Sequence, residues 1–294
     1  MQALARWLVA RPLNSVLALG ATMSLPLLSF LSGAVLVFAI LHKGWRSAVL
    51  EAGGALALLG VFGLVLGTRL DFLLASAVSV WAPALLLALL LQRTRSLTLT
   101  LQVAWLVTLG AMLVFFAAVG DPVPIWQGWI ETMGRTLSEQ GMYEQAEMFT
   151  RDVAGTAGQM TMIAALVFWS VSVMSLVLGY KLHRQLPGTA ARFGRFRDLD
   201  FGRVIALATA IASVAAWLGG WMPLENMAFV MFAMFWLQGL AIAHWSHGQK
   251  FLPTFGIVAL YVLLPLLNVI VLLGLAVTGY IDAWFRFRRL KVAG

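Results

Sequence analysis

Ser47–Gly67 has the sequence SAVLEAGGALALLGVFGLVLG, and Leu70–Leu91, which follows it closely, has the sequence LDFLLASAVSVWAPALLLALLL. A helix needs about 20 apolar residues to cross the hydrocarbon core of a bilayer, and both stretches reach that length. Each carries a single charged residue, Glu51 in the first and Asp71 in the second. Two such stretches in succession predict a pair of membrane-spanning helices.

The rest of the chain repeats this pattern. Four further stretches meet the same criterion: Ser96–Val119, Gln159–Tyr180, Val204–Trp221 and Asn226–Ala243. Of the 294 residues, 61% are hydrophobic and 11% are charged, and the mean hydropathy is +0.90. A soluble domain carries about 25% charged residues, so most of this chain must be solvated by lipid. We therefore predict an all-α, polytopic transmembrane helix bundle, with residues 1–294 forming a single integral membrane domain.

Two apolar stretches near the termini, Leu13–Leu41 and Pro253–Phe285, are too long for one untilted span and contain Pro26 and Pro265 near their middles. Proline removes a backbone donor and clashes with the preceding turn, so a helix break is expected at each position. Each stretch is either one kinked helix or a hairpin of two short helices. Together with the clean spans, this predicts about eight or more membrane helices.

The distribution of basic residues favours the hairpins. If both broken stretches return to the side on which they start, then of the 20 Lys and Arg only Arg69, Arg135 and Arg151 lie outside. This positive-inside bias predicts a bacterial inner (cytoplasmic) membrane protein with both termini cytoplasmic. Arg6 and Arg11 then belong to a retained first element rather than to a removed signal peptide. The net charge of +8 indicates contact with anionic lipid and not with nucleic acid.

A polar segment, residues 120–158, is predicted on the outer side. Apolar residues recur within it at three- and four-residue spacing: Trp126, Trp129, Ile130, Met133 and Leu137. This spacing predicts an amphipathic helix at the membrane interface, which serves either as a lid or as a connection resting on the headgroups.

A basic segment, residues 181–203, is predicted on the inner side. Its candidate partner-binding residues are Arg192, Arg195 and Arg197, although a stop-transfer cluster explains the same charges. Asp200 is placed to cap the helix that begins near Phe201, because its carboxylate can accept the first unsatisfied amide N–H groups.

Glycines in the first quoted span recur on one face. Gly53, Gly60 and Gly67 are seven residues apart, and Gly63 completes a Gly-x-x-x-Gly pair with Gly67. Small residues on one helix face let two backbones approach closely in a membrane, so we predict a helix-packing role, either within the chain or between copies.

Polar residues of similar outer depth form the candidate ligand site: Asp71, Gln159, Trp221, Glu225 and Asn226. An aromatic residue beside several polar groups at one end of a helix bundle is typical of a small-molecule pocket. Gln102, Gln238 and Asn268 lie deeper, where amides either bond across helices or contact a ligand.

Catalytic chemistry is not indicated. The chain has no Cys, which excludes disulfides, thiolate nucleophiles and Cys-ligated metals. His244 and His247 share a helix face without a carboxylate at ligand spacing, so we expect interfacial histidines rather than a metal site. No nucleophile, base and oxyanion site assemble, and no nucleotide-binding motif is present. We predict neither an enzyme nor a bound cofactor.

Several short motifs spread over nearly the whole chain suggest a family: Leu25–Ser29, Phe193–Asp200, Leu237–His244, Leu263–Leu267 and Ile281–Arg289. In these the chain resembles the YybS-like bacterial membrane proteins, a family without an established activity. That family is similar to the substrate-binding S components of energy-coupling-factor vitamin transporters. The resemblance implies a ligand captured from outside and an ATP-driven partner. The Ala-x-x-x-Ala docking face of many S components is replaced here by Ala18-x-x-x-Thr22 and Gly20-x-x-x-Ser24.

Two hypotheses follow. The chain is either a small-molecule binding or transport component, energised by a partner or a gradient, or a non-transport scaffold that organises envelope or cytoplasmic proteins. The first predicts a pocket between helices, and the second predicts a dry bundle with a groove for a partner.

Overall fold

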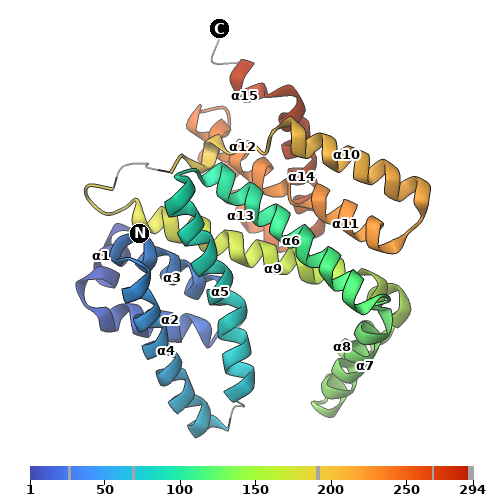
Figure 1. The fold of residues 1–294 in the computed structure, drawn as a ribbon, viewed down its shortest axis with the longest axis horizontal. Helices are drawn as coiled ribbons and strands as arrows, with labels where there is room; N and C mark the ends of the chain where they lie inside the picture. Colours follow the sequence, from blue (N-terminus) through green and yellow to red (C-terminus); the bar gives the residue numbers. More distant parts are fainter. Residues whose placement is uncertain (26–27, 68–69, 190–192, 267, 291–294) are drawn as a thin grey trace. The chain divides into compact units, whose positions relative to one another are not determined.

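The computed structural model describes residues 1–25, 28–67, 70–189, 193–266 and 268–290, which form helices and connecting loops without a strand (Figure 1). Within these residues, six helical segments are long and apolar enough to cross a membrane. They are α4 (Trp45–Leu66), α5 (Leu70–Thr94), α6 (Leu97–Val119), α9 (Val153–His183), α10 (Gly202–Gly219) and the consecutive pair α11 (Met222–Ala233) and α12 (Trp236–Gly248). The prediction of an all-α, polytopic membrane protein is confirmed.

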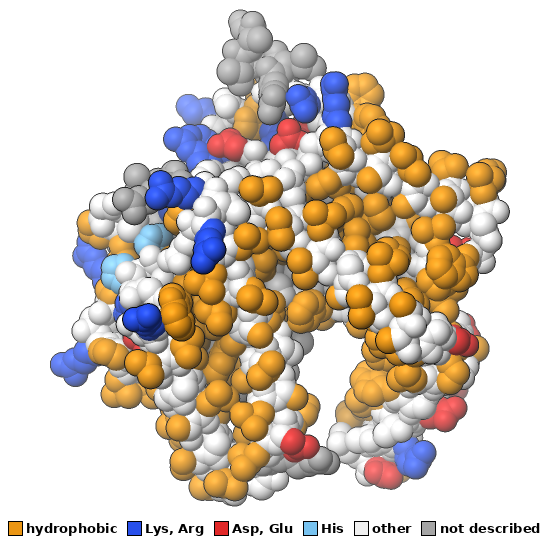
Figure 2. Space-filling model, in the orientation of Figure 1, with side chains coloured by type: hydrophobic (Ala, Val, Ile, Leu, Met, Phe, Trp, Pro, Cys, Tyr) orange, Lys and Arg blue, Asp and Glu red, His pale blue; other side chains and the backbone are white. Residues whose placement is uncertain are grey.

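Large apolar side chains cover the outside of these helices. Leu50 and Val65 on α4 and Val204 and Trp217 on α10 are largely exposed. Figure 2 shows hydrophobic side chains along the visible surfaces of the long helices, with few charges among them. Surfaces this apolar are unfavourable in water, whereas the acyl chains of a bilayer solvate them.

The contacts divide the chain into two compact units. The first unit comprises Met1–Ala104 and Phe168–Phe196, and the second comprises Trp105–Val167 and Arg197–Gly294. The divisions fall inside α6 and α9, so each of these helices contributes residues to both units.

The first broken stretch forms a hairpin in the first unit. Helix α1 (Gln2–Ala10) precedes it, and α2 (Pro12–Met23) and α3 (Ser29–Lys43) are its two arms. Near the turn, the Ser32 hydroxyl donates to the Leu19 carbonyl at 2.9 Å. At the far end, Lys43 Nζ donates to Ser15 Oγ at 3.1 Å. The two arms are therefore antiparallel, as the charge distribution predicted, while Pro26 itself lies outside the described residues.

Helix α3 is the centre of the first unit. Every residue from Ser32 to Ile40 is buried, and α3 contacts α2, α4 and α5. A fourth neighbour is the second half of α9, whose Ser175 hydroxyl donates to the Phe30 carbonyl at 2.9 Å. With 15 residues α3 is about 22 Å long, short of the roughly 30 Å hydrocarbon core. Its burial against four helices explains how so short a helix is accommodated.

The second broken stretch lies in the second unit and also divides where proline predicted. Helix α13 (Thr254–Leu266) ends one residue after Pro265, and α14 (Asn268–Phe285) follows; both contact α12. The α12–α14 crossing is close because it is made at glycines. A Cβ at Gly239 would meet the Leu275 carbonyl, and one at Gly279 would meet the Phe235 carbonyl.

The predicted span Asn226–Ala243 differs in detail. The helical segment is longer, from Met222 to Gly248, and a tight turn at Met234 and Phe235 separates α11 from α12. There the Phe235 N–H donates to the Phe232 carbonyl at 3.0 Å, a three-residue step in place of the α-helical four. Neither proline nor glycine marks this position in the sequence, so pattern analysis could not locate it.

The polar segment, residues 120–158, contains two helices, α7 (Val123–Glu139) and α8 (Tyr143–Thr150), packed on each other. Ile130 and Gly134 on α7 and Ala146 on α8 are buried. The Trp126 indole N–H donates to Thr161 Oγ1 at 2.8 Å, which ties α7 to the first half of α9. The amphipathic pattern thus corresponds to a helical pair, of which the spacing analysis predicted the first member.

Candidate functional site

A pocket lies in the first unit at one end of α2, α3, α4 and α5. Its volume is about 410 Å³, within the size range of small-molecule sites. The last turns of α2 and α4 and the first turns of α3 and α5 surround it, at the end of the α4–α5 pair remote from Arg46 and Arg93. The lining residues are Met23, Ser24, Ser29, Leu59, Phe62, Gly63, Phe72, Leu73, Ser76, Ser79 and Val80.

The polar groups of this pocket are serine hydroxyls. Ser24 Oγ donates to the Gly20 carbonyl at 3.0 Å, and Ser79 Oγ donates to the Ser76 carbonyl at 2.8 Å. A hydroxyl whose proton is used in this way still has lone pairs to accept a bond from a ligand. Ser29 and Ser76 add two further hydroxyls, and no charged side chain is among the described lining residues. The arrangement presents hydroxyls among apolar side chains, and these can hydrogen-bond a ligand.

The predicted ligand residues are divided between the units. Asp71 lies in the first turn of α5 in the first unit, exposed and adjacent in sequence to the pocket residue Phe72. The other predicted residues, Gln159, Trp221, Glu225 and Asn226, belong to the second unit. The site formed by these residues stays a prediction.

Within the second unit, Asn226 has a structural partner. It is buried, and its Nδ2 donates to the Gly158 carbonyl at 3.0 Å, beside Gln159. Asn226 thus contacts the residue that precedes Gln159, and a shared ligand site stays a prediction. Gln159, Trp221 and Glu225 are exposed.

A buried ion pair lies in the first unit near the ends of α2 and α3 that face away from the pocket. Lys43 Nζ lies 2.6 Å from Glu51 Oε1 and also donates to Ser15 Oγ, which in turn donates to the Leu8 carbonyl. Among the described residues, Glu51 Oε2 has no hydrogen-bond partner. The single charged residue of the first quoted stretch is therefore paired with Lys43.

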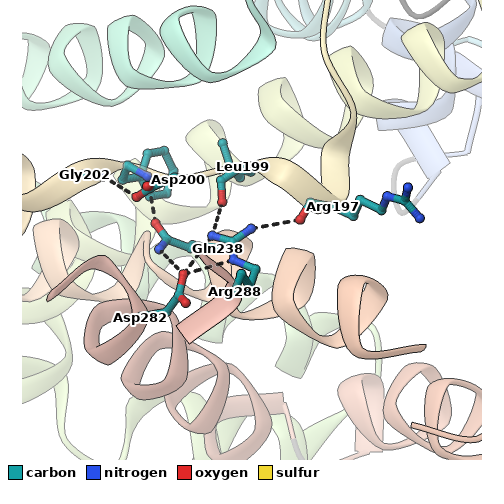
Figure 3. A network of polar contacts seen from close by, with 8 residues as sticks. Arg197, Leu199, Asp200, Gly202, Gln238, Asp282 and Arg288 are labelled. Carbon is teal, nitrogen blue, oxygen red and sulfur yellow. Dashed lines mark hydrogen bonds and ion pairs between the residues drawn. The ribbon is translucent and has the colours of Figure 1, made fainter. Parts of the chain in front are cut away.

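A second buried network joins three segments of the second unit (Figure 3). Arg288, on α15 (Phe287–Leu290), donates from Nη2 to Asp282 Oδ2 at 2.7 Å. Its guanidinium also donates to the carbonyls of Arg197 at 2.8 Å and Leu199 at 2.6 Å. Asp282 Oδ2 further accepts from Gln238 Nε2 at 3.0 Å. Helix α14 is thereby tied both to α12 and to the loop that precedes α10.

Gln238 completes this network at the start of α10. Its Oε1 accepts the backbone N–H of Phe201 at 2.8 Å, while Asp200 Oδ1 accepts that of Gly202 at 2.9 Å. The N-cap residue is Phe201 and not Asp200 as predicted, because the helix begins at Gly202, but the Asp200 carboxylate still accepts the N–H of that first helical residue. Gln238 bonds across helices, one of its two predicted roles. Sequence analysis missed Asp282 and Arg288, although a carboxylate in the last turn of an apolar span before a basic cluster was an available signal.

One of the predicted partner-binding arginines, Arg197, is part of this network. Arg195 is exposed, and it follows Gly194, whose carbonyl accepts from the Tyr180 hydroxyl at 2.9 Å. Arg197 holds Arg288 through its carbonyl and leaves its guanidinium partly exposed, 4.0 Å from Asp198. Arg192 lies outside the described residues, and partner binding stays a prediction.

The predicted glycine face of α4 has open space over much of its length. A Cβ at Gly53 or Gly60 would meet nothing within 4 Å, and Gly67 is a left-handed C-cap with φ of 70°. Gly63 lines the pocket. Close contacts of α4 with α2 instead involve Gly20 and Gly54, so the packing role of the predicted glycines stays a prediction.

The histidines near the end of α12 have ordinary partners. His244 Nε2 lies 2.8 Å from the Tyr261 hydroxyl, and His247 Nδ1 lies 2.9 Å from the Leu252 carbonyl. Among the described residues, no group of three or more His, Cys, Asp or Glu is arranged to hold a metal ion.

Comparison with protein-family models, curated proteins and solved structures finds no match for this chain. The resemblance to the YybS-like family stays a prediction.

Proposed function

We propose that this membrane protein binds a small molecule in the pocket between α2, α3, α4 and α5. The observation that carries the proposal is the pocket itself, a cavity of about 410 Å³ with serine hydroxyls set among apolar side chains. Four helix ends converge at the pocket. The buried α3 and, at the ends remote from the pocket, the Lys43–Glu51 pair hold these helices together. A rigid support of this kind preserves the shape of a binding site.

The resemblance to transporter S components extends the proposal. In that case the pocket captures its ligand at the outer face, both termini lie in the cytoplasm, and an ATP-driven partner supplies energy. The pocket position supports this orientation, since its end of the α4–α5 pair is remote from the basic residues Arg46 and Arg93.

A pair of substitutions on α5 tests the proposal. Ser76→Leu places a larger apolar side chain in the pocket, whereas Ala75→Leu makes a similar change at an exposed position that does not line it. We expect the unaltered protein and the Ala75→Leu variant to carry a co-purifying small molecule, detected by mass spectrometry of the extract. We expect Ser76→Leu to lose at least about 90% of it, because a tenfold loss needs only about 1.4 kcal/mol.

Equal thermal stability of the three proteins in detergent is the control for folding. A co-purifying molecule that is retained equally by Ser76→Leu and Ala75→Leu would show that the pocket is not its site.

A further inference from the structure

The walls and the mouth of the pocket differ in exposure. Leu59, Val80 and Met23 are 6%, 7% and 9% exposed and form its inner wall. Phe62 and Phe72, which also line it, are 57% and 64% exposed. These two side chains belong to membrane-spanning helices, near the end of α4 and the start of α5. The mouth therefore opens through exposed apolar surface near one end of these two helices.

The residues of α5 that line the pocket extend along the helix from Phe72 at the mouth to Val80 at the inner wall. Phe72, Leu73, Ser76, Ser79 and Val80 lie on one helix face, and the eight residue steps from Phe72 to Val80 rise about 12 Å along the helix. Ser24 and Ser29, at the ends of α2 and α3, place two hydroxyls beside the mouth. Ser76 and Ser79 add hydroxyls further along α5, so a ligand that fills this space meets hydroxyls both at the mouth and beside its apolar part.

The hydroxyls of the described lining suit an uncharged head group. An anionic headgroup in an apolar site needs a cation or several N–H donors, because burying an unpaired charge is costly. Among the described lining residues the polar groups are serine hydroxyls, with neither a lysine nor an arginine. Hydroxyls can donate to and accept from alcohols, ethers and carbonyls without a net charge.

We propose that the pocket binds a neutral amphiphile with a hydroxyl- or carbonyl-bearing head and a hydrocarbon chain, which enters from the outer leaflet rather than from water. This inference rests on the proposed small-molecule function and assigns its ligand class. Binding from lipid also explains why aromatic side chains at the mouth remain uncovered, since the bilayer both solvates them and delivers the ligand.

The test uses the full chain in phosphatidylcholine vesicles with a monoacylglycerol whose acyl chain carries a photoreactive diazirine. We expect labelling to concentrate on peptides that contain residues 59–63 and 72–80. An excess of unlabelled mono-oleoylglycerol should remove this labelling from the unaltered protein. This competition experiment does not depend on the folding of any variant. Ser76→Leu should reduce it about tenfold, equivalent to about 1.4 kcal/mol, and Ala75→Leu should leave it unchanged.

Labelling spread evenly over the lipid-facing helices, or labelling indifferent to Ser76→Leu, would overturn this inference. If phosphatidylglycerol, an anionic lipid, competes as strongly as mono-oleoylglycerol does, the proposal of a neutral head group is wrong. If mass spectrometry instead finds a charged, water-soluble compound that Ser76→Leu loses, the ligand class is wrong while the proposed function stands. If neither experiment finds a molecule that depends on Ser76, both proposals fail.

Discussion

At the scale of single residues, each unit keeps a carboxylate in apolar surroundings with a basic partner: Glu51 with Lys43 in one, and Asp282 with Arg288 in the other. A buried ion pair contributes little net stability, because desolvation of both charges offsets their attraction. Its effect is to specify geometry, since an alternative packing would leave a charge unpaired. Arg288 adds the carbonyls of Arg197 and Leu199 to its carboxylate, so a misplaced loop would lose two further bonds.

The Asp282→Asn substitution should therefore lower the free energy of unfolding by about 2–4 kcal/mol, because it leaves a largely buried guanidinium without its counter-charge. The side chains of Asp282 and Arg288 are 2% and 12% exposed, so water screens the loss only slightly. The measurement is the thermal unfolding midpoint in detergent. Adding Arg288→Met to Asp282→Asn should recover part of the loss. A single variant as stable as the unaltered protein would show that the pair does not contribute to the fold.

At the scale of helices, close crossings depend on glycines whose role only the structure reveals. Gly239 and Gly279 bring α12 and α14 together at backbone carbonyls. Gly33 of α3 lies against Ser175 of α9, and Gly179 of α9 lies against the Ala34 carbonyl of α3. Carbonyl groups in a helix cannot move aside as a flexible side chain can. A methyl group at these crossings must push two helices apart.

A matched pair on α14 tests this. Gly279→Ala would place its Cβ against the Phe235 carbonyl, whereas Gly274→Ala would meet nothing within 4 Å. We expect Gly279→Ala to destabilise the protein by about 1–3 kcal/mol through overpacking. Gly274→Ala should be neutral or stabilising by up to about 1 kcal/mol, the helix-propensity difference. Thermal unfolding in detergent compares them, and equal midpoints would contradict the proposed contact.

Helix positions were predictable from sequence because hydropathy and length decide which segments enter lipid. The spans α4, α5 and α6 and the breaks near Pro26 and Pro265 followed from apolar runs and from the missing proline donor. Contacts between helices were not predictable, because glycine is frequent in this chain and spacing alone does not identify its partner. The glycines of α4 recur at regular spacing, yet Gly53 and Gly60 have open space beside them. The pocket combines residues from four helices. The membrane depth estimated from the sequence pointed only to Asp71, which is adjacent to the lining residue Phe72.

At the scale of the whole molecule, basic residues orient the chain. The hairpin formed by α2 and α3 returns the chain to its starting side, which keeps Arg6, Arg11 and Lys43 together. The positive-inside effect then predicts that this side is cytoplasmic. Reporter fusions after Lys43 and after Arg195 should show the activity typical of the cytoplasm, and a fusion at Gly141 should show periplasmic activity. Periplasmic activity at residue 195 would reverse the orientation and move the pocket to the cytoplasmic leaflet.

The central position of α3 has a consequence for biogenesis. Helix α3 packs against two residues of α9: Gly179 lies against the Ala34 carbonyl, and the Ser175 hydroxyl donates to the Phe30 carbonyl. Both residues are synthesised long after α3, once residues of the second unit have been made. At about 5–20 residues per second the interval is on the order of ten seconds. During that time the side of α3 that later packs on α9 lacks its permanent neighbour.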